Sequence, residues 1–210
     1  MPLIFQLMAK ISAIFSDVGG VLLTNGWDRH SRRRLVEQFK LDWDEYEDRH
    51  ELVATAFDTG KLELSLYLKR TIFYRPRDFT VEQVKEFMLG ESQPFEDSLA
   101  LLARIAATGR YFLATLNNES RELNLYRIER FELKKYFNVF FSSCFLGAKK
   151  PDRDIYVKAL EMSQRAPQEC VFIDDRGLNL ECAAHLGMHT VQFQDAGQLE
   201  RDLRALGVEF

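Results

Sequence analysis

The sequence predicts an α/β protein in which a doubly wound parallel sheet carries a small inserted α-helical domain. Two observations lead to this prediction. Short apolar runs alternate with amphipathic helical patterns, which is typical of a parallel sheet covered by helices on both faces. A long helical stretch also separates the first apolar run from the second, so the sheet is interrupted after its first strand.

Five apolar runs are the predicted strands. Their short lengths and the Gly, Asn or Asp residues that follow several of them favour buried strands followed by tight loops. They lie at residues 10–16, 110–116, 139–141, 170–173 and 190–193. Helices are predicted at residues 95–107, 154–162 and 179–186, the first ending at Gly109 and the last capped by Gly187.

The stretch from about residue 26 to residue 90 is rich in charge and aromatic residues and has helical periodicity without a clear buried strand. We expect it to form a separate domain, although its helices could instead cover the sheet. The predicted division is a sheet domain of residues 10–24 and 91–210 and a helical domain of residues 25–90. The apolar N-terminus lacks a basic start and a cleavage site, so residues 1–9 are expected to be a short lead-in rather than a signal peptide.

Composition excludes several classes of protein. The chain has 210 residues, of which 46% are hydrophobic and 29% charged, so it can bury a core without disulfide or metal staples. A formal net charge of −4 argues against nucleic-acid binding, and no apolar run reaches the ~18 residues that span a bilayer. Three cysteines without a CxxC motif favour reduced thiols in a cytoplasmic protein: Cys144, Cys170 and Cys182.

Polar side chains follow three of the predicted strands. Asp17 ends the first run, Asn117 ends the second, and Asp174 and Asp175 end the fourth. The carboxyl ends of parallel strands meet at one edge of the sheet, so these side chains are expected to converge. Adjacent carboxylates repel each other unless a cation lies nearby, so the Asp174–Asp175 pair indicates a Mg²⁺ site, or alternatively a helix cap.

Two further features could complete such a site. Gly19 and Gly20 let the backbone approach a ligand closely beside Asp17, which would then act as a nucleophile or metal ligand, or would simply start a turn. Lys149 and Lys150 precede a Pro-Asp pair. A buried lysine beside carboxylates would hold an anionic substrate and keep the nucleophile ionised, whereas the alternative is a solvated surface pair.

Together, the motifs resemble those of the haloacid dehalogenase-like (HAD) hydrolase superfamily, of the class with a helical cap inserted after the first motif. The resemblance extends from about residue 11 to residue 193. It rests on the segments DVGGVL (17–22), LATLNN (113–118), GAKKPD (147–152), FIDDRGLN (172–179) and AAHLGM (183–188). It implies a Rossmann-like doubly wound sheet with an inserted helical cap domain.

The resemblance also implies a Mg²⁺-dependent phosphatase. Asp17 would attack the phosphorus atom of a small phosphorylated metabolite, giving an aspartyl-phosphate that water hydrolyses. Asp17, the backbone carbonyl of Gly19 and Asp175 would bind the metal. Supporting roles are implied for other residues. Asp174 and Asn179 would lie behind the metal ligands, and Lys150 would neutralise Asp17 and a phosphoryl oxygen. Asn117, or the backbone after it, would hydrogen-bond the phosphoryl group, with Asn118 and Gly20 also binding the substrate.

Two positions depart from the family pattern. Phosphatases of this family usually carry a second aspartate where this chain has Gly19, and that aspartate protonates the leaving group and later activates water. Its loss would slow turnover by ~10²–10⁴-fold unless another group substitutes. Asn117 replaces the usual Ser or Thr of the second motif, which is a milder change because an amide also donates hydrogen bonds.

Other functions stay open at this stage. A 2-haloacid dehalogenase would fit Gly19 but not the Asp174–Asp175 pair, and a low-activity regulatory or binding member of the family is the other alternative. The expected partner is a small phosphorylated substrate, with no nucleic acid or membrane, for a monomer or homodimer. Basic and aromatic cap residues could favour a sugar phosphate or nucleotide, the candidates being Trp27, Arg29, His30 and Arg33.

Overall fold

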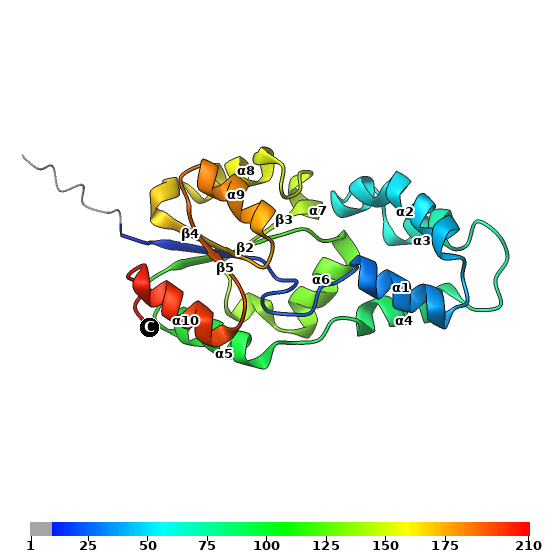
Figure 1. Cartoon of the computed structure of the whole chain (residues 1–210), viewed down its shortest axis with the longest axis horizontal. Helices are drawn as coiled ribbons and strands as arrows, with labels where there is room; N and C mark the ends of the chain where they lie inside the picture. The colour runs from blue at the N-terminus through cyan, green and yellow to red at the C-terminus, as the bar shows by residue number, and fades with distance from the viewer. Residues whose placement is uncertain (1–9) are drawn as a thin grey trace, which may run out of the picture.

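A computed structural model describes residues 10–210 and contains one five-stranded sheet (Figure 1). All of its strand pairs are parallel, and the strand order is β3-β2-β1-β4-β5. The strands are β1 (Ala13–Ser16), β2 (Phe112–Asn117), β3 (Val139–Ser142), β4 (Cys170–Asp174) and β5 (His189–Gln192). The order reverses at β1, so the strands that end in Asp17, Asn117 and Asp174 are direct neighbours.

Helices of the sheet part cover both faces of the sheet. They are α5 (Glu96–Ala107), α6 (Arg121–Arg130), α7 (Ser143–Leu146), α8 (Arg153–Ser163), α9 (Gly177–His185) and α10 (Ala196–Ala205), with 3-10 turns η1 (Leu133–Lys135) and η2 (Pro167–Glu169). Side chains alternate along β1: Ile14 packs in the apolar cluster with α5 and α10, whereas Ala13 and Phe15 pack in the cluster with α8 and α9. The predicted doubly wound sheet is therefore confirmed.

Four helices lie between β1 and β2: α1 (Arg29–Gln38), α2 (Trp43–Asp58), α3 (Leu64–Thr71) and α4 (Val81–Gly90). Figure 1 shows them gathered at the end of the molecule opposite the C-terminus. They share an apolar core of their own, which includes the fully buried Leu35, Phe57 and Tyr67. The predicted helical insertion after the first strand is confirmed, and the exact domain boundaries stay a prediction.

Most predicted elements lie within a few residues of the observed ones. The predicted helices did not include α6, whose many charged residues weaken its apolar periodicity, or α10. Gly187 does follow the α9 helix, with a φ of 92° that favours glycine. The predicted lead-in, residues 1–9, lies outside the described part of the chain. Within residues 10–210, no helix is long and apolar enough to cross a membrane, and all three cysteines are free thiols.

Candidate functional site

Three carboxylates meet at the carboxyl edge of the sheet. Asp17 follows β1, and Asp174 and Asp175 lie at the end of the neighbouring β4. Each offers an oxygen within 4.8 Å of the others, a spacing that could hold a metal ion. The convergence predicted from the strand ends is thus observed for these residues, and its cause is the parallel β1–β4 pairing.

Lys150 lies between two of these carboxylates. Its Nζ is 2.9 Å from Asp17 Oδ2 and 2.6 Å from Asp174 Oδ2, and its side chain is only 1% exposed. The side chain of Asn118 fixes the Lys150 backbone, because the amide donates to the Lys150 carbonyl and accepts from its N–H at 2.8 Å each. Lys150 is therefore a buried residue with fixed contacts in the site and not a solvated surface group.

Asp174 and Asp175 differ in their hydrogen bonds, which indicates different roles for the two residues. Both oxygens of Asp174 accept from Asn179 Nδ2 at 3.0 Å, and one also accepts from the Arg176 N–H. Asp174 is thus already satisfied. In contrast, Asp175 Oδ1 is buried and has no hydrogen-bond partner among the described residues. A buried anionic oxygen without a donor is costly, and a cation is the group that would satisfy it.

Burial sets the electrostatics of these acids. It raises the pKa of Asp17 to about 6, although the Lys150 ammonium acts to lower it. Burial, followed by the charge of Asp174, also raises the pKa of Asp175. A divalent cation would reverse both effects, because it favours the ionised carboxylates. The group has three carboxylates against one lysine, and one carboxylate oxygen has no hydrogen-bond partner among the described residues. Such a set of oxygen ligands suits a hard cation such as Mg²⁺.

The Asn117 side chain makes its hydrogen bonds inside the protein. Its Nδ2 donates to Asn124 Oδ1 at 3.0 Å, and its Oδ1 accepts from Ser142 Oγ at 2.9 Å. Asn117 is buried and does not line the cleft described below, whereas Asn118 does. The Asn117 side chain therefore connects the end of β2 to β3 and α6.

A cleft of about 620 Å³ opens between the carboxyl edge of the sheet and the inserted helices. The sheet side contributes Asp17, Gly19, Asn118, Glu119, Arg127, Lys149, Lys150, Arg176 and Asn179. The helical side contributes Trp27, Arg29, His30, Arg32, His50 and Asp58. Of the four predicted cap residues, Trp27, Arg29 and His30 line the cleft. Arg33 does not, and its guanidinium instead lies 4.2 Å from the ring centre of Trp43.

A buried polar network supports the helical wall of the cleft. The Tyr67 hydroxyl lies 2.8 Å from His50 Nδ1 and 2.9 Å from the Tyr46 hydroxyl, and it accepts from Trp27 Nε1 at 2.8 Å. Burial lowers the pKa of His50 to about 4 and raises that of Tyr67 to about 12. The cleft therefore presents a neutral imidazole and a fixed indole at neutral pH.

Comparison with known proteins now places the chain in a family. A family model of the haloacid dehalogenase-like hydrolases matches residues 11–187. The chain belongs to this family. A curated relative is flavin mononucleotide hydrolase 1 of Arabidopsis thaliana, 30% identical over 162 residues. That match covers 77% of this HAD-like hydrolase and only 65% of the relative's own length.

Solved structures share the fold of this HAD-like hydrolase. A HAD family enzyme of Bacteroides thetaiotaomicron, solved with magnesium and inorganic phosphate, has a TM-score of 0.72 at 20% identity. The match covers 88% of this chain and 95% of that one. An L-2-haloacid dehalogenase has a TM-score of 0.65 at 19% identity, covering 93% and 99% of the two chains. At these identities the likeness establishes the fold alone.

Sequence reasoning missed two charged residues that line the cleft of this HAD-like hydrolase. Glu119 and Arg127 are both buried, and Glu119 Oε2 lies 3.3 Å from Arg127 Nη1. Glu119 comes two residues after Asn117, which ends β2. Because the carboxyl ends of parallel strands meet at one edge of the sheet, the reasoning that located Asp17 also applies to Glu119. No comparable signal marks Arg127, because it lies inside a charged helix and reaches the cleft only through the way α6 packs.

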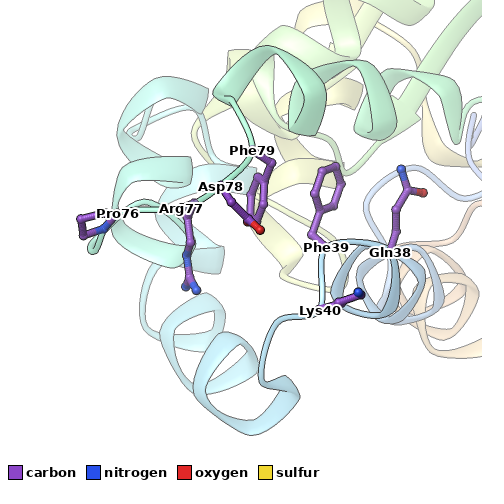
Figure 2. A pocket seen from close by; sticks show the side chains of 7 residues that line it. All are labelled: Gln38, Phe39, Lys40, Pro76, Arg77, Asp78 and Phe79. Atoms are coloured by element: carbon purple, nitrogen blue, oxygen red, sulfur yellow. The ribbon is translucent and has the colours of Figure 1, made fainter.

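A second hollow, of about 490 Å³, lies in the helical insert of this HAD-like hydrolase (Figure 2). It lies between the end of α1, at residues 38–40, and the segment of residues 76–79 that precedes α4. The rings of Phe39 and Phe79 have centres 4.6 Å apart in its wall. It contains none of the convergent carboxylates, and so the sheet-edge cleft is the candidate active site.

Proposed function

We propose that this protein is a Mg²⁺-dependent phosphatase that acts on a small phosphorylated metabolite through an aspartyl-phosphate. The observation that carries the proposal is the grouping of Asp17, Asp175 and Lys150 at one sheet edge, where one buried oxygen of Asp175 has no hydrogen-bond partner among the described residues. This grouping provides a nucleophile, an oxygen site for a hard cation and a fixed positive charge, which are the parts that phosphoryl transfer requires.

The chain's own residues would divide the reaction as follows. Asp17 Oδ1 accepts the Val18 N–H at 2.7 Å, and Oδ2 lies beside Lys150, so the carboxylate is held in a single orientation for in-line attack. Lys150 offsets the negative charge that gathers on the phosphoryl oxygens. Asn118 holds the Lys150 backbone in place.

Asp17, Asp175 and the carbonyl of Gly19 would bind the Mg²⁺, with Asp174 and Asn179 orienting the site from behind. When bound, this ion neutralises phosphate charge and orients the phosphorus atom toward the nucleophile. Gly20 permits this arrangement, because a Cβ at that position would lie 2.5 Å from Asp175 Oδ2.

The substrate would lie with its phosphate at the sheet edge and its remaining part against the inserted helices. The wall there offers an indole from Trp27, the neutral His50 and the exposed Arg29. An aromatic and cationic wall suits a nucleotide-like or sugar-phosphate leaving group. The name of the Arabidopsis relative makes flavin mononucleotide a reasonable first member of a substrate panel.

Hydrolysis of p-nitrophenyl phosphate tests the proposal, with Mg²⁺ and with chelator, in wild type and Asp17→Asn. Activity that requires Mg²⁺ and is lost in Asp17→Asn is the expected result. Asp154→Asn, an exposed aspartate in α8, is the matched control and should keep full activity. Absence of activity in the wild type, together with metal-free release of chloride from 2-chloropropionate, would overturn the phosphatase function in favour of a dehalogenase.

A further inference from the structure

Glu119 is a buried acid that the phosphatase mechanism above does not use. It lies in the loop between β2 and α6, only 6% exposed, and it lines the same cleft as Asp17 and Gly19. Its Oε1 accepts the Ser120 N–H at 3.0 Å, and its Oε2 faces Arg127. Burying an ionisable group costs free energy, and such a group in a reaction cleft is a candidate for a role in catalysis.

The space beside Gly19 lies close to Arg127, the ion-pair partner of Glu119. A Cβ at Gly19 would lie 3.2 Å from Asn25 Oδ1 and 3.6 Å from Arg127 Nη1, and that nitrogen lies 3.3 Å from Glu119 Oε2. The Arg127 guanidinium is therefore near both Glu119 and the place that a side chain at position 19 would occupy. Gly26 completes the arrangement, because a Cβ there would collide with Glu119 Oε2. The chain thus leaves room for this acid and its arginine at Gly26.

The surroundings of Glu119 are held in place by both parts of the protein. Arg127 also donates to Thr24 O at 2.8 Å and Ser92 Oγ at 3.0 Å, and these residues belong to the two segments that connect the sheet to the inserted helices. The acid therefore stands at the junction between the sheet edge and the helical wall. A leaving group that extends from the phosphate toward that wall passes this junction.

The charges around Glu119 leave both of its protonation states accessible. Burial raises its pKa to about 7, and Arg127 acts to lower it, whereas Asp58 and Asp17 raise it further. Asp58 itself is paired with Lys149 at 3.0 Å. A general acid–base group works best when its pKa is near the working pH, since it must both donate and accept a proton.

We propose that Glu119 is the acid–base group that replaces the missing aspartate at position 19, an inference that rests on the proposed phosphatase function. As Asp17 forms its bond to phosphorus, the bond from phosphorus to the leaving oxygen breaks and that oxygen takes the proton of Glu119. The Glu119 carboxylate then takes a proton from water, whose oxygen bonds to phosphorus. Inorganic phosphate leaves, and Asp17 and protonated Glu119 are regenerated.

The test compares wild type and Glu119→Gln on a series of aryl phosphates whose phenols range from strongly to weakly acidic. A weakly acidic phenol needs the proton most, so Glu119→Gln should lose about 10²–10⁴-fold in kcat/KM there and little with p-nitrophenyl phosphate. The plot of log kcat/KM against phenol pKa should become steeper. Glu122→Gln, a control whose Oε1 accepts the Leu64 N–H at 2.9 Å, should keep the wild-type slope.

A pH profile and a direct titration provide further readouts. The first step needs protonated Glu119, so wild-type kcat/KM should fall as pH rises through about 7, and this limb should disappear in Glu119→Gln. Carbon-13 NMR of the side-chain carboxyls, which requires no turnover, should show a glutamate titrating near that pH in wild type and not in the variant.

A uniform loss across all aryl phosphates in Glu119→Gln, or no loss, would overturn the proposal and leave the Glu119–Arg127 pair a structural one. Gly19→Asp is a second test of the proposal, which can be used if Glu119→Gln does not fold. This variant restores the usual acid, and it should leave the wild-type slope unchanged if Glu119 already donates the proton. A much shallower slope in Gly19→Asp would refute the role of Glu119. If wild type hydrolyses no aryl phosphate with Mg²⁺, the phosphatase function itself fails.

Discussion

Replacing Lys150 by methionine removes the positive charge from a buried cluster while keeping most of the apolar stem. The ammonium lies within 3 Å of an oxygen of both Asp17 and Asp174, and its side chain is 1% exposed. Removing one partner of such a buried pair leaves uncompensated charge, which costs about 3–5 kcal/mol of the free energy of unfolding. We expect Lys150→Met to lose this amount in urea unfolding followed by circular dichroism, in metal-free buffer near pH 8.

The neighbouring Lys149 provides a matched control. It pairs with Asp58 at 3.0 Å, but the two side chains are 27% and 33% exposed. Water screens a partly exposed pair, so Lys149→Met should lose about 1 kcal/mol or less. The reasoning is refuted if the two variants lose equal stability, because burial is the property that separates them.

The direction in which the stability of Lys150→Met changes with pH can also be predicted. Burial already raises the pKa of Asp17 from 3.8 to about 6, and loss of Lys150 must raise it further. The folded state then holds the proton more tightly than the unfolded state, so stability falls as pH rises from about 3.8 through the folded pKa. The deficit of Lys150→Met relative to wild type should therefore shrink as pH falls from about 8 toward 5.

Three further predictions concern stability and metal binding. Burial lowers the pKa of His50 from 6.5 to about 4, so the folded state should lose stability as pH falls through this window. The free energy of unfolding of His50→Asn, measured with urea, should fall less than that of wild type over the same pH range. Gly20→Ala should weaken Mg²⁺ binding by calorimetric titration, because its Cβ would displace Asp175, whereas Gly109→Ala has open space at a similar positive φ and should not. Tyr67→Phe should cost about 1–3 kcal/mol in urea unfolding, since its buried hydroxyl has three hydrogen-bonding partners. An unchanged unfolding midpoint in Tyr67→Phe, or equal Mg²⁺ affinity in the two glycine variants, would contradict these expectations.

The sequence supported reliable prediction where local pattern decides structure. The apolar runs that became β1, β2 and β4 end in Asp17, Asn117 and Asp174, and parallel strands carry their carboxyl ends to one edge regardless of the intervening length. The helical insertion was also predictable, because no strand-like run occurs between β1 and β2. The α6 helix was not, since its charged residues mask the apolar positions that pack on the sheet.

The sequence by itself determined the family motifs, the strand ends and the side chains available there, because these depend on residue type and short-range spacing. Only the tertiary structure decided how they are used. It turned the Asn117 amide toward Asn124 and Ser142, satisfied Asp174 through Asn179, and left an oxygen of Asp175 without a donor. These outcomes depend on how strands and helices pack over long sequence separations, which residue order alone does not specify.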